Sequence, residues 1–228
     1  MPRTKERVLP QTFYARDPRL VARELLGKVL VRTLSNRAGS PRLSGRIVEV
    51  EVYLGDGDLA AHSAAGRTTR NEVLFGPPGH AYVYFIYGVH YCLNFSCLPE
   101  GQAGCVLLRA IEPLAGIEQM AESRGISRER LHSSSGLKLL TSGPGRVCEA
   151  LSVTRERLNG QELYRKESPL KIVDDGMRLD DIGESTRIGI RKSSEMPLRY
   201  FIPGNDFVSG KRNHLTTETP STPRQAKG

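Results

Sequence analysis

The sequence predicts a single soluble domain of the mixed α/β class. Three features indicate this class: stretches that alternate with the period of β-strands, segments with helix-capping signals, and no apolar run long enough to span a membrane. A chain of 228 residues is long enough to build a substantial core. Without internal repeats or linkers, we expect the domain at 11–209, between a flexible basic leader at 1–10 and a disordered tail at 210–228.

Charge and cysteine content narrow the classes of partner and location. The chain has 33 Lys and Arg against 25 Asp and Glu, a formal net charge of +8. A basic surface suits a nucleic acid, although many basic proteins bind none. No secretory signal is apparent, so we expect a cytoplasmic location, on the nucleoid in a bacterium. Spacings that fit neither zinc pairs nor a disulfide framework predict reduced, buried thiols for Cys92, Cys97, Cys105 and Cys148.

The N-terminal part predicts a helix followed by two antiparallel strands. Asp17 suits the N-cap, Pro18 suits the first turn, and Gly27 ends the helix. The predicted strands are Lys28–Thr33 and Leu43–Tyr53, joined by a turn at Asn36–Pro41.

The second of these strands carries an unusual set of polar residues. From Gly45 to Leu54, odd and even positions point to opposite faces. One face holds Val48, Val50 and Val52, and the other holds Ile47, Glu49, Glu51 and Tyr53. With His62 close behind, an acid, an aromatic ring and an imidazole would share one cavity. A solvated glutamate face is the common alternative.

A second predicted hairpin is rich in tyrosine. Strands at Ala81–Gly88 and Tyr91–Ser96 would place Tyr87 near the tip. Exposed aromatic residues there suit a protein that unstacks nucleic acid, whereas aromatic residues within strands are by default core packing. The preceding residues, 60–80, show no clear period and predict a long loop.

The remaining elements are predicted from shorter patterns. An apolar strand at Cys105–Ile111, interrupted by Arg109, is closed by Glu112-Pro113 and followed by a helix at Leu114–Arg124. A helix at Arg146–Leu151, opened by Ser142 and Pro144, would suit a phosphate beside Arg146, or would be a plain capped helix. Closing strands are predicted at Thr186–Ile190 and Leu198–Ile202, after a weakly patterned region at 155–185.

An acid-bearing strand, a histidine, a tyrosine ladder and a basic surface together meet the needs of an enzyme that flips a base into an aromatic pocket. Here the sequence resembles the alkyladenine (3-methyladenine) DNA glycosylases of base-excision repair, over roughly residues 12–210. The most specific motifs are GRIVEVEVYLG at 45–55, AAHS at 60–63, YVYFIYG at 82–88, CLN at 92–94, VLLRA at 106–110, SGP at 142–144 and PLRY at 197–200.

The resemblance implies a fold and an activity. The fold is a single mixed α/β domain around a curved antiparallel sheet, similar to a formyltransferase C-terminal domain, with a hairpin that protrudes into the DNA minor groove. The activity is hydrolysis of the N-glycosidic bond of alkylated or deaminated purines in double-stranded DNA. We expect a monomer with no cofactor, no metal and no membrane partner.

The resemblance also implies residue roles. Glu51 matches the general base, and Arg109 and the backbone carbonyl of Ile188 match the positions that hold the attacking water. The charge of Arg109 should help keep Glu51 ionised. The implied base pocket is Tyr53, His62, Tyr84 and Asn94, of which Asn94 crowds normal guanine; no role is implied for Glu49.

The implied DNA contacts centre on the hairpin tip. Tyr87 matches the residue that fills the gap left by the flipped base, while Val89 and His90 depart from the family pattern. The expected DNA-binding residues are Tyr87, Val89, Arg67, Arg70, Ser142 and Arg146.

Chemical reasoning agrees with these roles and leaves two alternatives. A cationic alkylated purine is attracted by aromatic faces and is already a good leaving group, so a single carboxylate suffices. No lysine lies between Lys28 and Lys138, which predicts a monofunctional enzyme without a Schiff-base step. The alternatives are a non-catalytic nucleic-acid-binding module and a carbohydrate glycosidase; the glycosidase would need a second acid.

Overall fold

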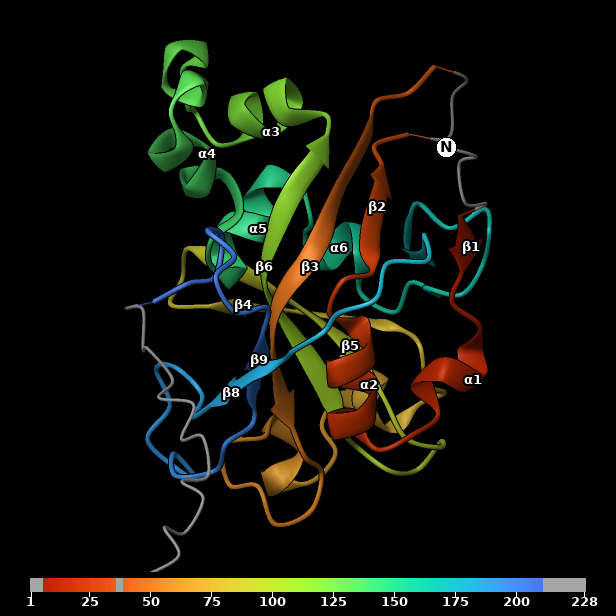
Figure 1. Ribbon diagram of the computed structural model, residues 1–228. Coiled ribbons are helices and arrows are strands. Elements are labelled where there is room, and N and C mark those ends of the chain that lie inside the picture. The colour runs from red at the N-terminus through yellow and green to blue at the C-terminus, as the bar shows by residue number, and fades with distance from the viewer. Residues whose placement is uncertain (1–5, 36–38, 211–228) are drawn as a thin grey trace, which may run out of the picture.

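In the computed structural model, which describes residues 6–35 and 39–210, one antiparallel sheet organises the chain (Figure 1). Its main path runs β1-β7-β2-β3-β6-β5-β4, and β9 pairs with both β3 and β8. The strands are β1 Arg7–Val8, β2 Val29–Thr33, β3 Arg42–Tyr53, β4 Ala81–Ile86, β5 His90–Ser96, β6 Cys105–Ala115, β7 Leu170–Asp174, β8 Gly183–Ser185 and β9 Arg199–Phe201.

The long strand β3 joins two parts of this sheet. Along one edge its first half, from Arg42 to Arg46, pairs with β2, and its second half, from Glu49 to Glu51, pairs with β9. Its other edge pairs with β6 over almost its full length. Gly45 permits this close approach, because a Cβ there would lie 2.7 Å from the Ile111 side chain. The sheet therefore divides at the middle of β3, where Glu49 lies.

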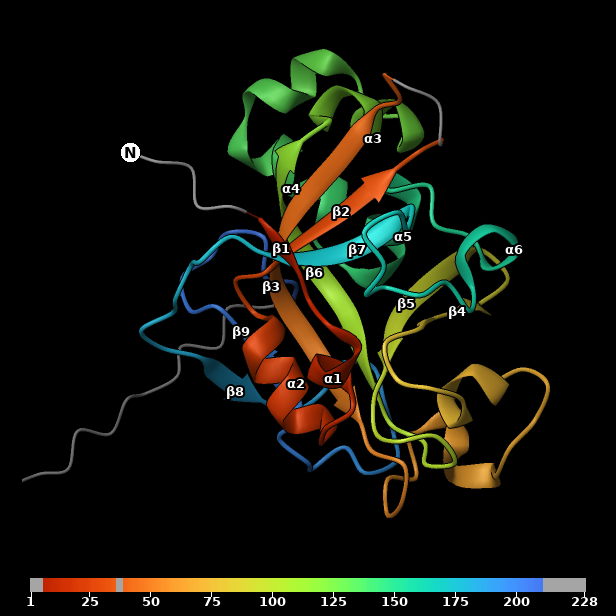
Figure 2. The same cartoon turned by 90° about the vertical axis from the view of Figure 1, so that its right-hand side faces the viewer.

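Short helices cover the sheet in two groups (Figures 1 and 2). Helix α2 packs on β3, and α5 packs on β5 and β6 with α3 and α4 beside it. No helix among the described residues is long and apolar enough to cross a membrane. The helices are α1 Gln11–Tyr14, α2 Pro18–Leu25, α3 Ile117–Ser123, α4 Ser134–Thr141, α5 Pro144–Ala150 and α6 Arg155–Leu158, with 3-10 turns η1 His62–Ala65, η2 Glu72–Phe75 and η3 Arg128–His132.

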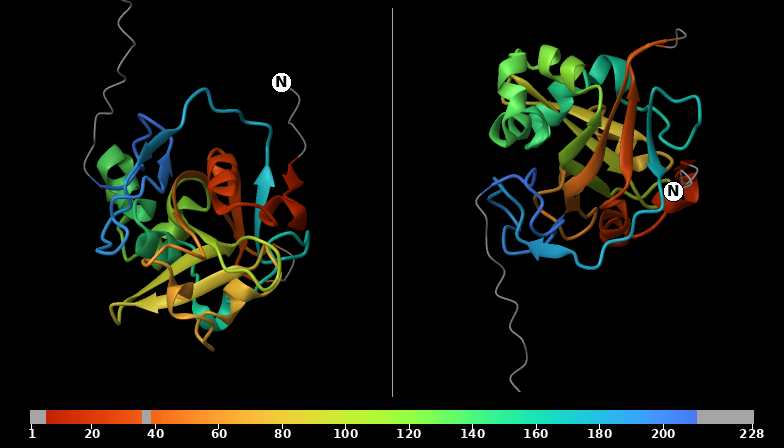
Figure 3. Two further views of the ribbon diagram at one scale, coloured as in Figure 1. Left: turned by 90° about the horizontal axis from the view of Figure 1, so that it is seen from below. Right: turned by 45° about the horizontal axis from the view of Figure 1, so that its top comes forward.

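The predicted mixed α/β domain around a curved antiparallel sheet is confirmed. Asp17 caps α2 by accepting a hydrogen bond from the Arg19 amide, with Pro18 in the first turn, as predicted. The tyrosine-rich hairpin is β4–β5, and the left view of Figure 3 shows it, in yellow, extending from the body of the molecule. All four cysteines are buried free thiols, as expected.

The alternation predicted for β3 is wrong at Ile47 and Val48. A register shift between Ile47 and Glu49 leaves Val48 as the extra residue of a β-bulge. Because a bulge changes which side chains share a face, Ile47 packs in the main core with Val50 and Val52 rather than beside the glutamates. The solvated alternative is also wrong, because Glu49 and Glu51 are both 0% exposed.

Several predicted boundaries differ from the structure. Glu112-Pro113 does not close β6, which continues to Ala115, so α3 begins only at Ile117. Thr186–Ile190 is not a strand; the strand there is the earlier β8. The structure also contains elements that were not predicted. These are β7 and α6 in the weakly patterned region 155–185, α4 ahead of the helix predicted at Arg146–Leu151, η1 and η2 in the predicted loop 60–80, and β1 in the predicted leader 1–10.

The predicted leader and tail, and the turn at Asn36–Pro41, lie partly outside the described residues. Within the leader, Arg7 and Val8 pair with Asp174 and Val173, so these two residues belong to the sheet.

Candidate active site

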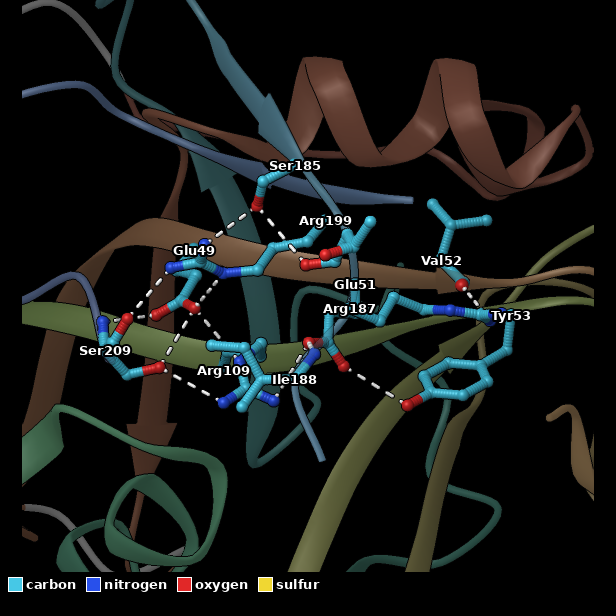
Figure 4. Close-up of polar contacts among 11 residues, drawn as sticks. Glu49, Glu51, Val52, Tyr53, Arg109, Ser185, Arg187, Ile188, Arg199 and Ser209 are labelled. Atoms are coloured by element: carbon cyan, nitrogen blue, oxygen red, sulfur yellow. Dashed lines mark hydrogen bonds and ion pairs between the residues drawn. The ribbon is translucent and has the colours of Figure 1, made fainter. Parts of the chain in front are cut away.

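Glu51 is a buried carboxylate whose two oxygens have unequal surroundings (Figure 4). Its Oε1 accepts a 2.7 Å hydrogen bond from the Ile188 backbone N–H and forms a 3.0 Å ion pair with Arg109 Nη1. Its Oε2 accepts one longer bond, 3.2 Å, from the Tyr53 hydroxyl. Oε1 is therefore held by two strong donors, and Oε2 is the oxygen with capacity for a further partner.

The resemblance assigned the Ile188 carbonyl to water binding. In the structure the group of Ile188 that contacts Glu51 is its backbone amide, brought there by the segment between β8 and β9. That amide and Arg109 approach Oε1 from different segments of the chain, so the orientation of the carboxylate is determined by tertiary contacts rather than by β3 alone.

Burial sets the protonation behaviour of Glu51. Loss of water raises the pKa of its carboxyl above the ordinary 4.5, and this effect outweighs the lowering by Arg109 and by the Ile188 amide. Glu49 raises it further. Arg109 thus acts in the expected direction, but the net result is a more basic carboxylate than a solvated glutamate.

Glu49 lies beside Glu51 on the same face of β3 and accepts hydrogen bonds from Arg109, Arg199 and Ser209. Its Oε1 receives Arg109 Nε at 3.0 Å and Arg199 Nε at 2.7 Å. The backbone N–H of Ser209 donates to Oε2 at 2.6 Å, and the Ser209 hydroxyl to Oε1 at 2.9 Å. Two carboxylates and two guanidinium groups therefore form one buried network.

A second buried ion pair supports the site from the other side. Arg187 donates to both oxygens of Asp58, at 2.6 and 2.8 Å, and to the Val52 carbonyl at 2.9 Å. Its guanidinium also lies 4.7 Å from the centre of the Tyr53 ring. This pair joins the loop after β3 to the segment that carries Ile188, and it fixes one face of Tyr53.

Beside Tyr53 there is a narrow pocket with aromatic walls. It occupies about 320 Å³ when its open mouth is counted. All four predicted base-pocket residues line it: Tyr53, His62, Tyr84 and Asn94. The other lining residues are Ala60, Ala61, Ser63, Leu74, Tyr82, Gly104 and Cys105.

Contacts among the lining residues hold the walls in place. His62 Nδ1 lies 2.9 Å from the Tyr82 hydroxyl, and the His62 ring meets the Tyr84 ring edge to face at 4.4 Å between centroids. Partial burial, with the nearby Arg70 charge, lowers the pKa of His62, so its neutral form is favoured. Asn94 donates to the Tyr82 carbonyl at 3.1 Å, which orients its amide in the buried part of the pocket.

The expected DNA-contacting residues are distributed around the hairpin. Tyr87 and Val89 at the tip are 80% and 64% exposed, and Tyr87 adopts a positive φ of 55°. Arg70, which is exposed, donates to the Phe85 carbonyl at 3.2 Å, so it lies along the hairpin. Arg67 is exposed, but no contact among the described residues ties it to the hairpin.

The predicted phosphate site at α5 has a simpler geometry than expected. The helix begins at Pro144 with Gly143 at the N-cap, and no side chain caps it, so Ser142 does not open it. Arg146 is exposed and donates to the Ser142 carbonyl. The ring of His90 would lie 3.0 Å from a Cβ at Gly145, which places the start of α5 against the hairpin.

Sequence reasoning did not identify Asp58, Arg187, Arg199 or Ser209 as members of the site. Arginines within buried apolar segments are a usable signal, because such a side chain requires a buried acidic partner. Among the described residues, no three His, Cys, Asp or Glu side chains converge as metal ligands would.

Several named proteins are similar to this chain over most of its length. A chain of Koribacter versatilis named "Putative 3-methyladenine DNA glycosylase" is 59% identical over 204 residues, 90% of this chain and 94% of the relative. Proteins of the same name from Clostridium acetobutylicum and Methanoculleus marisnigri are 44% and 42% identical, over 88% of this chain and 97% and 98% of theirs. The sequence pattern of the methylpurine-DNA glycosylases matches residues 12–206. The chain therefore belongs to the methylpurine-DNA glycosylase family.

Proposed function

We propose that this protein is a DNA glycosylase that flips alkylated or deaminated purines out of double-stranded DNA and hydrolyses their N-glycosidic bond. The observation that carries the proposal is Glu51: it is fully buried, one oxygen is held by two donors, and the other oxygen faces the hydroxyl of a pocket-lining tyrosine. A protein that only bound DNA would have no need for such a carboxylate.

Glu51 Oε2 is the oxygen proposed to take the proton of the attacking water. An ionised carboxylate whose pKa is raised accepts a proton more readily than a solvated one. Its negative charge also stabilises the cation-like sugar that forms as the base leaves. Arg109 and the segment at Ile188 hold the carboxylate and its water in position.

The aromatic walls are proposed to select the base. Tyr53, His62 and Tyr84 present ring surfaces that stack on a purine and attract the positive charge of an alkylated one. The neutral form of His62 avoids repelling that charge. Asn94, held by the Tyr82 carbonyl, is proposed to crowd the exocyclic amino group of normal guanine.

The hairpin and its neighbours are proposed to bind the duplex. Tyr87 at the exposed tip would fill the space of the extruded nucleotide, and Val89 beside it would contact the opened base step. Exposed basic side chains would contact phosphates: Arg70 along the hairpin, Arg146 with the Ser142 backbone at the start of α5, and Arg67 in the segment between η1 and η2.

A monofunctional reaction is proposed because no lysine is among the described residues that line the pocket. The two lysines that flank the site region in sequence are engaged elsewhere: Lys28 pairs with Asp174 and Lys138 with Asp206. Attack by water leaves an intact abasic strand, whereas attack by lysine would lead to strand cleavage.

The test is a single-turnover assay in EDTA on a duplex with one hypoxanthine or ethenoadenine, and on methylated DNA. Free base should be released, and the strand should break only after alkaline treatment. Breakage without alkali, or a borohydride-trapped adduct, would contradict the monofunctional mechanism. Specific DNA binding with no release of any base would leave the non-catalytic binding module as the function.

A further inference from the structure

Arg109 is shared between two glutamates (Figure 4). Its Nε contacts Glu49 Oε1 and its Nη1 contacts Glu51 Oε1, each at 3.0 Å. Its Nη2 donates to the Ser209 hydroxyl at 3.2 Å. Every nitrogen of the guanidinium thus has a partner, so the group cannot rotate toward Glu51 without losing contacts.

Glu49 anchors this arrangement from behind. Besides Arg109, it binds Arg199 and both the amide and the hydroxyl of Ser209. Ser209 lies at the end of a segment that is also tied to β6, where Asn205 donates to Glu112 at 2.9 Å. Glu49 therefore joins β3, β6, β9 and the C-terminal described segment at one point.

The charges of the network balance only when Glu49 is present. Glu49 and Glu51 are opposed by Arg109 and Arg199, and none of the four is more than 7% exposed. Without the Glu49 carboxylate, Arg109 would be free to bind both oxygens of Glu51, the bidentate geometry that guanidinium groups favour. The oxygen needed for water would then be occupied.

We propose that Glu49 is a positioning residue for base excision: it holds Arg109 to a single contact with Glu51 and so keeps Oε2 of Glu51 free for the attacking water. The inference rests on the proposed function, because it assumes that Glu51 is the base. It adds a role to a residue to which the family resemblance assigned none.

The charged and titratable groups that face Glu51 come from five segments. They are Glu49 and Tyr53 on β3, Arg109 on β6, Cys92 on β5, Arg199 on β9 and Arg187 in the segment after β8. Glu49 raises the pKa of Glu51 by like-charge repulsion, so removing its charge lowers that pKa.

The first test is Glu49→Gln, measured as single-turnover release of 7-methylguanine, a cationic base, across a range of pH. The acid limb should move to lower pH, because Glu51 loses a like-charged neighbour. The plateau rate should fall roughly 3- to 30-fold, because Glu51 becomes a weaker and partly blocked base.

A second variant has the opposite predicted sign. Arg199→Gln removes a cation that faces Glu49. Arg109 then compensates more of the charge of Glu49 and less of the charge of Glu51, so the pKa of Glu51 should rise and the acid limb should move to higher pH. General loosening of the fold would lower the active fraction of both variants without opposite shifts. Glu49→Asp, which keeps the charge, should retain a midpoint close to that of the wild type.

The matched control is Glu184→Gln, which removes an exposed glutamate paired with Arg23 and should leave the pH profile unchanged. Unchanged midpoints in Glu49→Gln and Arg199→Gln, in whichever of them folds, would overturn the inference. If the midpoints are unchanged but the wild type releases base and Glu51→Gln does not, the inference fails and the proposed function stands. If the wild type and Glu51→Gln behave alike, the proposed function itself fails.

Discussion

Two buried acid–arginine sets flank Tyr53, and they differ in one respect. In the Asp58–Arg187 pair each carboxylate oxygen has two donors, one from Arg187 and one from a backbone amide, Leu54 or Ala60. In the Glu51 set, one oxygen has two donors and the other has a single 3.2 Å contact. Both sets are hidden from solvent in the same region of the fold.

The difference separates structural charge from reactive charge. A carboxylate with all its hydrogen-bonding capacity used can stabilise a fold but cannot accept another proton-bearing group. A carboxylate with a spare site is incompletely compensated, which is costly in a core and useful in catalysis. Burial alone therefore does not separate the two roles; the long single contact of Glu51 Oε2, made by the pocket-lining Tyr53, supports the proposal that Glu51 is the base.

The largest expected effect on stability comes from the Asp58–Arg187 pair. Asp58→Asn should destabilise the fold by about 3–5 kcal/mol, because it leaves Arg187 buried without an opposing charge. Urea unfolding measures this change. A loss below about 1 kcal/mol would mean that the pair is not structural, and the comparison would fail.

Arg109→Gln tests the electrostatics of the Glu51 set. Arg109 lowers the pKa of Glu51, so its removal raises that pKa further. Since only the ionised carboxylate is a base, excision at neutral pH should fall on the order of 10-fold to 100-fold and recover partly at higher pH. The acid limb of the wild type should itself lie above pH 4.5, the ordinary value for glutamate.

The matched variant for this prediction is Arg109→Lys. It keeps the positive charge but loses the fork that reaches Glu49 and Glu51 together. Its acid limb should stay closer to that of the wild type than the limb of Arg109→Gln. An acid limb in Arg109→Gln that moves to lower pH would contradict the assigned electrostatics.

Tyr87→Ser should affect DNA rather than either acid–arginine set. The side chain is 80% exposed and contributes little to the fold, so unfolding should be unchanged. Affinity for a duplex with one damaged base should weaken by roughly 1–3 kcal/mol, because nothing would fill the opened step. Titration with a fluorescent duplex measures this, with Phe at position 87 as the conservative comparison.

The smallest effect is expected at Arg146. Arg146→Gln should lower the affinity for all duplexes by a similar factor and reduce the slope of log affinity against log salt by about 0.9, the value for one phosphate contact. An unchanged slope would remove Arg146 from the DNA surface. The same measurement on Arg67→Gln and Arg70→Gln would test the other two proposed phosphate contacts.

Local patterns predicted much of the fold. The period of two located β3 and the β4–β5 hairpin, and Asp17-Pro18 located the start of α2, because these signals depend on neighbouring residues. The bulge at Val48 and the extension of β6 past Pro113 were missed, because they depend on pairing between distant strands. Strands as short as β8, three residues, hold their conformation only through such pairing.

The site was predictable in part for the same reason. Glu51 and Tyr53 share a strand face, and Tyr84 and Asn94 lie on the adjacent hairpin, so motifs could identify them. The Ile188 amide that binds Glu51 is 137 residues away from it, and Ser209, which binds Glu49, is 160 residues away from Glu49, so neither partner has a local signature. Sequence therefore indicated the candidate reactive groups but not the network that orients them.

The most direct test of the account compares the wild type with Glu51→Gln in single-turnover base release and in binding to the same damaged duplex. Glu51→Gln should bind nearly as tightly as the wild type but release base slower by on the order of 10²-fold or more, because the proposed general base is lost. Equal release by the two proteins would contradict the central claim that the open oxygen of Glu51 activates the water.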